Sequence, residues 1–205
     1  MGYPRERFVR RLGRPATWDD LLDVPEDFIG EIIAGEVVAA PRPANPHGSV
    51  TSDLGALLGG PFRFGVGGPG GWVIVDEPRI RFGEDIRVPD LAGWHSERYS
   101  GPAVGPLTVI PDWICEVLSL STEAEDRGPK MDLYRRAGVS HVWLIGWQAR
   151  TLEVYRREAE GWLRVATWSG DTRVRAEPRR DRARSGSALD VPAAHAKRRA
   201  LIFWS

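Results

Sequence analysis

The chain has a single cysteine, Cys115, among its 205 residues. One cysteine cannot form an internal disulfide, which fits a protein that folds in a reducing compartment. The cysteine and the four histidines are widely scattered, and none of their spacings matches a zinc site. Small domains held by disulfides or zinc are therefore excluded, and the chain is long enough to fold around one hydrophobic core.

Long apolar runs and an excess of either charge are also missing. No stretch approaches the roughly 18–20 apolar residues that a bilayer-spanning helix needs, and the basic start lacks the apolar segment of a signal peptide. Basic and acidic side chains balance at 28 each. This balance does not predict tight non-specific binding to nucleic acid, although it leaves room for a local basic patch. We expect a cytoplasmic protein without membrane contact.

Composition divides the chain into three parts. Residues 1–15 carry five arginines and two prolines, and we expect them to form a flexible basic arm. Residues 16–177 show the alternation of strand and helix patterns that is typical of one folded domain. Residues 178–205 are rich in Arg, Ala and Ser without sustained periodicity, so we expect a disordered tail.

The order of elements in the middle part predicts the fold class. A short helix capped by Thr17 is followed by two strands that turn at Ala34-Gly35, where glycine supplies a positive φ. A helix is expected over residues 47–58 and a later one that ends at Gly138. Strands come before, between and after these helices. This order predicts an α/β fold with a mixed β-sheet flanked by helices, rather than a doubly wound parallel sheet.

A carboxylate interrupts the most strand-like run of the chain, "DWICEVLS". In a strand, Glu116 shares a face with Ile114 and Leu118, and such a face is normally buried. A buried carboxylate costs several kcal/mol unless a cation or metal faces it, or its pKa rises until it is neutral. The alternative is an edge-strand glutamate that faces water, and this residue alone does not decide between the two.

Three further polar residues stand at notable positions. Asp90 follows a proline that indicates the end or edge of a strand, although Pro-Asp is more often a turn than a site. Lys130 lies near a helix start on its apolar stripe, which is unfavourable for the helix dipole unless an anion faces it. The alternative is a solvated lysine. His47 opens the earlier helix, where a surface or capping role is more common than a place in a cleft.

Together, Asp90, Glu116 and Lys130 suit phosphodiester hydrolysis. Two carboxylates are ligands that Mg²⁺ or Mn²⁺ accepts. Such an ion lowers the pKa of a bound water and offsets charge on the phosphate. A lysine beside it can orient the water or stabilise the developing charge. The three residues therefore predict a metal-dependent nuclease.

The segments "VPDLAGW", "PDWICEVLSLST" and "DRGPKMDLYRRAGVSHVWLI" resemble the Uma-two family of putative restriction endonucleases, within the PD-(D/E)XK nuclease superfamily. The resemblance covers about residues 17–178 and implies a restriction-endonuclease-like fold. It implies that Asp90 and Glu116 are the metal-binding acids of the motif. The usual lysine position holds Leu118, so the resemblance assigns the catalytic lysine to Lys130 on the following helix.

The resemblance also implies a wider set of contacts. Glu31, in "GEIIAGE", is an additional candidate metal ligand. Independently of the resemblance, Arg135 and Arg136, an Arg-rich pair, are candidate phosphate contacts. The implied function is an endonuclease that uses Mg²⁺ or Mn²⁺ to hydrolyse DNA. Double-strand cleavage by one such site would need two chains, so a homodimer is expected. The resemblance does not decide whether the substrate is DNA or RNA, or which sequence is recognised.

Some positions depart from the family pattern. Leu120 stands where a proline is usual, and Gly146 where an aspartate usually ends the strand. The tail also lacks the family's acidic, leucine-rich ending, and a frameshift is one hypothesis for its composition, which an intact reading frame in the natural gene would contradict. These departures keep an alternative open, a catalytically degenerate module that binds nucleic acid or protein.

Overall fold

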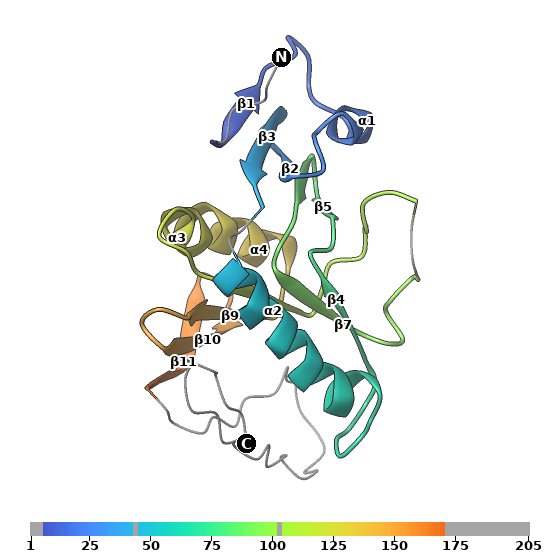
Figure 1. Cartoon of the computed structure of the whole chain (residues 1–205). Helices are drawn as coiled ribbons and strands as arrows, with labels where there is room; N and C mark the ends of the chain where they lie inside the picture. The colour runs from blue at the N-terminus through green and yellow to red at the C-terminus, as the bar shows by residue number, and fades with distance from the viewer. Residues whose placement is uncertain (1–5, 43–44, 102–103, 171–205) are drawn as a thin grey trace.

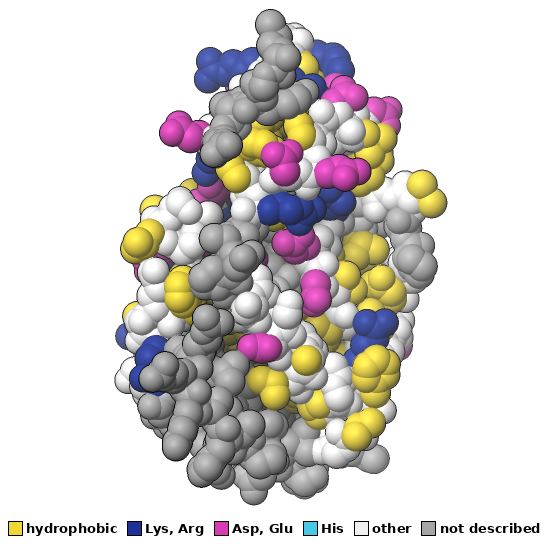
Figure 2. All heavy atoms as spheres, viewed as in Figure 1, with side chains coloured by type: hydrophobic (Ala, Val, Ile, Leu, Met, Phe, Trp, Pro, Cys, Tyr) yellow, Lys and Arg dark blue, Asp and Glu magenta, His cyan; other side chains and the backbone are white. Residues whose placement is uncertain are grey.

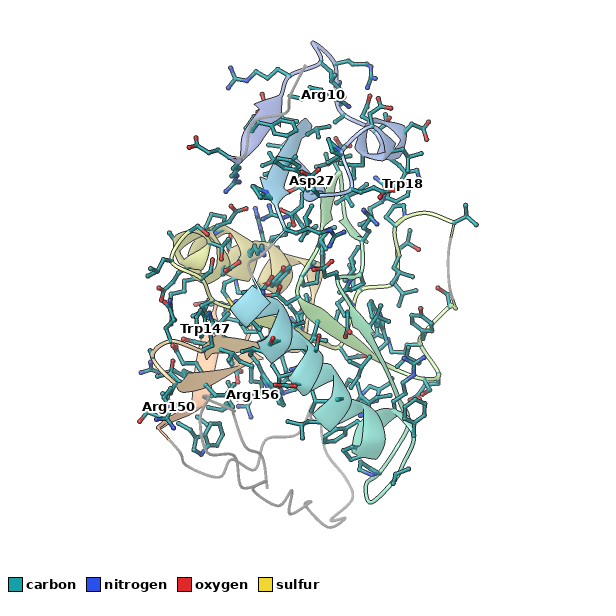
Figure 3. The ribbon with its side chains drawn as sticks, viewed as in Figure 1. Arg10, Trp18, Asp27, Trp147, Arg150 and Arg156 are labelled. Atoms are coloured by element: carbon teal, nitrogen blue, oxygen red, sulfur yellow. The ribbon has the colours of Figure 1, made fainter. Side chains whose placement is uncertain are left out.

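The computed structural model describes residues 6–42, 45–101 and 104–170. Two β-sheets dominate these residues, and Figure 1 shows the smaller sheet at the N-terminal end of the molecule. Figure 3 shows Arg10 and Trp18 at this end and Trp147 and Arg150 at the opposite one. No helix among the described residues is long and apolar enough to cross a membrane.

The larger sheet has six strands in the order β11-β10-β9-β8-β7-β4. Its central strands β8 and β9 are parallel, whereas the other pairs are antiparallel. The expected mixed sheet is therefore confirmed. Its strands, in chain order, are β4 (Trp72–Asp76), β7 (Leu91–His95), β8 (Trp113–Val117), β9 (His141–Gly146), β10 (Thr151–Arg157) and β11 (Trp162–Ser169).

Helices cover both faces of the larger sheet, as Figure 1 shows for α2 (Asn45–Leu58) and α4 (Met131–Ala137). On one face, Leu54 and Leu58 of α2 pack with Trp113 and Trp143 of the sheet. On the other face, α4 packs against strand residues that include Ile114, Val142 and Leu144. Every residue of β8 is consequently buried, which places Glu116 in the interior.

A second sheet, which the sequence did not predict as a separate layer, has five antiparallel strands in the order β1-β3-β2-β6-β5. The expected turn at Ala34-Gly35 joins two of them, with φ of 50° and 78°. The strands are β1 (Phe8–Arg10), β2 (Phe28–Ile33), β3 (Glu36–Pro41), β5 (Ile80–Phe82) and β6 (Asp85–Arg87).

The expectation of a flexible arm over residues 1–15 is wrong for β1, which pairs with β3. Its Phe8 ring meets the Phe28 ring edge-on, with centroids 5.4 Å apart. A strand of three residues is too short to show periodicity, so a long-range partner decides its structure. Residues 1–5 and the expected tail over 178–205 lie outside the described residues.

Short helical segments complete the fold. The expected capped helix is α1 (Trp18–Leu22), with a capping box between Thr17 and Asp20. The helix expected over 47–58 is confirmed and begins two residues earlier, at Asn45. A π-helical turn η1 (Gly59–Arg63) follows α2, while α3 (Glu123–Glu125) and a second π-helical turn, η2 (Asp126–Lys130), lead into α4.

The end of α4 gives a prediction for stability. Gly138 has φ of +97°, and a Cβ there would meet nothing within 4 Å, so backbone conformation alone opposes a side chain. We expect Gly138→Ala to lower the free energy of unfolding by about 1 kcal/mol. Gly128→Ala is the matched control, since Gly128 is equally open but its φ is not positive. Urea unfolding checks both, and an equal effect of the two would contradict the explanation.

Candidate active site

Asp90 and Glu116 are brought together by the pairing of β7 with β8. Asp90 immediately precedes β7, and Leu91 pairs with Cys115, the residue before Glu116. The Val117 amide donates to Asp90 Oδ2 at 2.7 Å, and the Asp90 amide lies 3.4 Å from Glu116 Oε2. The two acids, 26 residues apart in sequence, thus line the same cavity.

The buried carboxyl group of Glu116 has a cationic partner, Lys130, as expected for a carboxylate inside a strand. Its side chain is 2% exposed, and Lys130 Nζ lies 3.1 Å from Glu116 Oε1. The Tyr134 hydroxyl donates to the same oxygen at 2.5 Å. Burial raises the pKa of Glu116 to about 8, although the Lys130 charge acts in the opposite direction. Both donors contact one oxygen and leave Oε2 on the side of Asp90.

Lys130 is held by a second carboxylate that sequence reasoning missed. Asp126, one helical turn earlier and 3% exposed, has Oδ1 2.9 Å from Lys130 Nζ. Burial alone would lower the pKa of Lys130, but the charge of Glu116, followed by those of Tyr134 and Asp126, raises it well above its ordinary value. Lys130 is therefore a buried ammonium ion. The i,i+4 spacing of Asp126 and Lys130 was the available sequence signal.

His47 joins this group from the first turn of α2. Its Nε2 lies 2.7 Å from the Val117 carbonyl oxygen and 3.4 Å from Asp90 Oδ2. Burial alone would lower the pKa of His47, but the hydrogen bond and charge of Asp90 raise it. The imidazole is thus a buried cavity residue (8% exposed). The sequence placed it at a helix start without showing which end of the sheet that helix would reach.

These side chains line one wall of a cavity of about 470 Å³ between the two sheets. On the visible face of the molecule, Figure 2 shows acidic and basic side chains next to one another between the small sheet and α2. The cavity is also lined by hydroxyl side chains of the segment that follows β8, and by two arginines that flank β1 and β3 of the small sheet. The polar and charged lining residues are Glu6, Arg7, Glu31, Arg42, His47, Asp90, Glu116, Ser119, Ser121, Thr122, Glu125, Asp126 and Lys130.

A family model described as "Uma2: Putative restriction endonuclease" matches residues 18–180. The chain belongs to this family. No curated protein matches it. A crystal structure from Anabaena variabilis ATCC 29413, described as "a putative nuclease belonging to DUF820", matches it with a TM-score of 0.62 and 24% identity. The match covers 80% of this chain and 90% of that one, and it confirms the nuclease-like fold.

The other predicted site residues of this Uma2 chain lie in different surroundings. Glu31 lines the cavity, but its Oε1 accepts from the Val88 amide at 2.7 Å and lies 3.4 Å from Arg87 Nε. A role in metal binding is thus left to its second oxygen. Arg135 and Arg136 do not line the cavity, and each pairs with Asp132 on α4, at 3.2 and 3.4 Å. Their contact with phosphate stays a prediction.

The two positions that depart from the Uma2 pattern, Leu120 and Gly146, do not line the cavity. Leu120 is 85% exposed, and its neighbours Ser119 and Ser121 still line the cavity. Gly146 ends β9 and does not line it. A Cβ on Gly146 would come within 2.5 Å of the Thr151 hydroxyl, so the aspartate usual in the family would need that side chain to move.

Proposed function

We propose that this chain is a metal-dependent endonuclease that hydrolyses DNA phosphodiester bonds. The observation that carries the proposal is the convergence of Asp90, Glu116 and Lys130 on one cavity wall. Membership of the Uma2 family supports a nuclease. The Anabaena structure, described as "a putative nuclease", shares the fold of this chain.

The donor atoms at the cavity fit a hard divalent cation such as Mg²⁺ or Mn²⁺. Such ions prefer carboxylate and carbonyl oxygens and complete their shell with water. Asp90 Oδ2, Glu116 Oε2 and the Val117 carbonyl oxygen form that kind of set. Among the described residues, no group of three or more His, Cys, Asp or Glu side chains is arranged to hold a metal ion. Two carboxylates with a backbone carbonyl do not require such a group.

Each residue has a separate part in the proposed reaction. Asp90 and Glu116 hold the cation, and Glu116 does so after releasing the proton that its burial favours. When bound, the cation supplies an activated water and offsets charge on the phosphate. Tyr134 fixes Glu116 by bonding to Oε1 only, so that the orientation of the other oxygen is set. Lys130 stays protonated and places a positive charge where negative charge develops on the phosphate.

The charge of the cavity wall explains why a cation would be needed. Glu116 and Asp126 lie beside the ammonium group of Lys130, and Asp90 lies next to Glu116. A phosphate that approached this wall without a divalent cation would meet carboxylates, and like charges at such distances repel. Arg7 and Arg42 also line the cavity, and together with Arg135 and Arg136 we propose them as contacts for the DNA backbone. A homodimer would let two such sites cut both strands.

The proposal is tested by nicking of supercoiled plasmid DNA. We expect the full chain to convert plasmid to the open circle with Mg²⁺ or Mn²⁺ and to stop when EDTA removes the ion. Glu160→Gln is a matched control, because Glu160 is an exposed acid between β10 and β11. This variant should cleave as the wild type does. Cleavage that continues in EDTA would contradict metal dependence.

A second candidate function is a nuclease-fold module that has lost catalysis and binds nucleic acid or protein. It is favoured by the absence, among residues that the structure describes, of a preformed cluster of three metal-binding side chains. Titration with Mn²⁺ separates the two functions. A chain that binds DNA but no Mn²⁺ or Mg²⁺ at millimolar concentration would be the module.

A further inference from the structure

We propose that His47 is a ligand of the divalent cation and that its nitrogen makes the site favour Mn²⁺ over Mg²⁺. The inference rests on the proposed function, because it concerns the same cation. Its basis is the position of Nε2 beside two of the proposed donor atoms, 2.7 Å from the Val117 carbonyl oxygen and 3.4 Å from Asp90 Oδ2.

These separations suit neighbouring ligands of one ion. Ligand atoms that lie about 2.1 Å from an octahedral ion, at right angles to each other, are about 3 Å apart. The two distances from His47 Nε2 lie on either side of this value. In this structure the described residues hold no arrangement of three His, Cys, Asp or Glu side chains that could bind a metal ion. The imidazole ring would have to give up its hydrogen bond to the Val117 carbonyl oxygen for Nε2, Asp90 Oδ2 and that oxygen to become members of one coordination shell.

The fold holds His47 in this position. The Thr51 hydroxyl donates to the His47 carbonyl oxygen at 3.2 Å within the first turns of α2. Further along α2, Leu54 and Leu58 pack in the hydrophobic core against the larger sheet. The His47 side chain is 10% exposed, and its ring points at the Val117 carbonyl oxygen on the cavity wall. A ligand held by a packed helix loses little freedom when it binds an ion.

To bind a cation, the ring must give up the proton on Nε2. A carbonyl oxygen only accepts hydrogen bonds, so Nε2 is the donor toward Val117 in this structure. As a ligand, the neutral ring carries its proton on Nδ1 and offers the Nε2 lone pair. Mn²⁺ accepts an imidazole nitrogen among oxygen ligands more readily than Mg²⁺, which keeps to oxygen ligands and water. This difference is the source of the expected preference for Mn²⁺.

The same contacts admit an opposite role. As a donor to both oxygens, His47 would occupy the position of the cation and compete with it. The two roles differ in sign: removing a ligand weakens Mn²⁺ binding, whereas removing a competitor strengthens it. A binding measurement on His47 variants therefore decides between them.

The experiment is Mn²⁺ and Mg²⁺ titration by calorimetry, with pulsed electron paramagnetic resonance of bound Mn²⁺, on the full chain. We expect the wild type to show hyperfine coupling from an imidazole nitrogen. His47→Gln should lose this coupling and bind Mn²⁺ about 10-fold or more weakly, while its Mg²⁺ affinity changes by less than about 3-fold. His47→Ala is the second variant, and thermal unfolding shows that each is folded.

Three outcomes overturn this inference or its basis in distinguishable ways. Bound Mn²⁺ without nitrogen coupling, or His47 variants that bind Mn²⁺ as tightly as the wild type, would overturn the role of His47 alone. Tighter Mn²⁺ binding by the variants would identify His47 as a competitor. If Asp90→Asn binds Mn²⁺ as the wild type does, or if the wild type binds none, the metal site of the proposed function fails as well.

Discussion

Asp90→Asn is expected to lower metal-dependent DNA cleavage by about 10³-fold. Asparagine keeps the shape of the side chain and an oxygen that can accept from the Val117 amide, now at 2.7 Å. The fold should therefore persist. The change removes the negative charge that would hold the cation, which supplies several kcal/mol of transition-state stabilisation. A loss of about 4 kcal/mol corresponds to a factor of about 10³ in rate.

The measurement compares initial rates of plasmid nicking for the wild type, Asp90→Asn and the exposed-acid control Glu160→Gln. Asp90→Asn should also fail to gain thermal stability when Mn²⁺ is added, because an ion stabilises only a folded state that binds it. Glu160→Gln should behave as the wild type in both assays. Undiminished cleavage by Asp90→Asn, with the control equally active, would refute the assignment of the site.

The parts of this fold that the sequence predicted are those governed by local pattern. The turn at Ala34-Gly35 and the C-terminal end of α4 at Gly138 follow from backbone conformation. The strand around Glu116 follows from its run of apolar residues. The separate five-stranded sheet depends instead on which distant strands pair, as β2 does with β6 through Ile32 and Ile86. No local pattern encodes such a choice. The three-residue strand β1 likewise depends on its pairing with the distant strand β3.

The candidate site divides in the same way. A lone carboxylate in an apolar strand and a lysine on an apolar helix stripe are local anomalies, and each explains the other once they lie 3.1 Å apart. Asp126 and Tyr134 showed no such anomaly, because a charged or aromatic residue is ordinary on a helix. Their importance comes from the burial of Lys130 and Glu116, which only the packing of α4 on the larger sheet establishes.

Lys130→Met tests the charge balance of this buried group. Methionine keeps most of the volume but leaves Glu116 and Asp126 without their ammonium partner. Removing one member of a buried ion pair typically costs about 3–5 kcal/mol. Removing one positioned group that stabilises charge in the transition state typically lowers rates by about 10²–10³-fold. We therefore expect Lys130→Met to be both less stable and nearly inactive in plasmid nicking.

The loss of stability should depend on pH in a defined direction. Burial raises the pKa of Glu116 to about 8, above the value of about 4.3 for an unfolded chain. Between about pH 4.3 and about pH 8, Glu116 has released its proton in the unfolded chain but retains it in the folded one. The free energy of unfolding therefore falls as pH rises through this range. Without the charge of Lys130 the pKa of Glu116 rises further, so the free energy of unfolding of Lys130→Met continues to fall above pH 8. The raised pKa of Lys130 keeps the wild-type ammonium charged throughout this range.

Urea unfolding of the wild type and Lys130→Met at pH 6, 8 and 9 measures this difference, which should widen above pH 8. Lys130→Arg is the control that restores the charge. Because a planar guanidinium does not reproduce the geometry of an ammonium group, it should recover more stability than activity. If Lys130→Met cleaves plasmid at the wild-type rate, the lysine only offsets buried charge. If its stability relative to the wild type does not change with pH, Glu116 is not the group whose ionisation Lys130 controls.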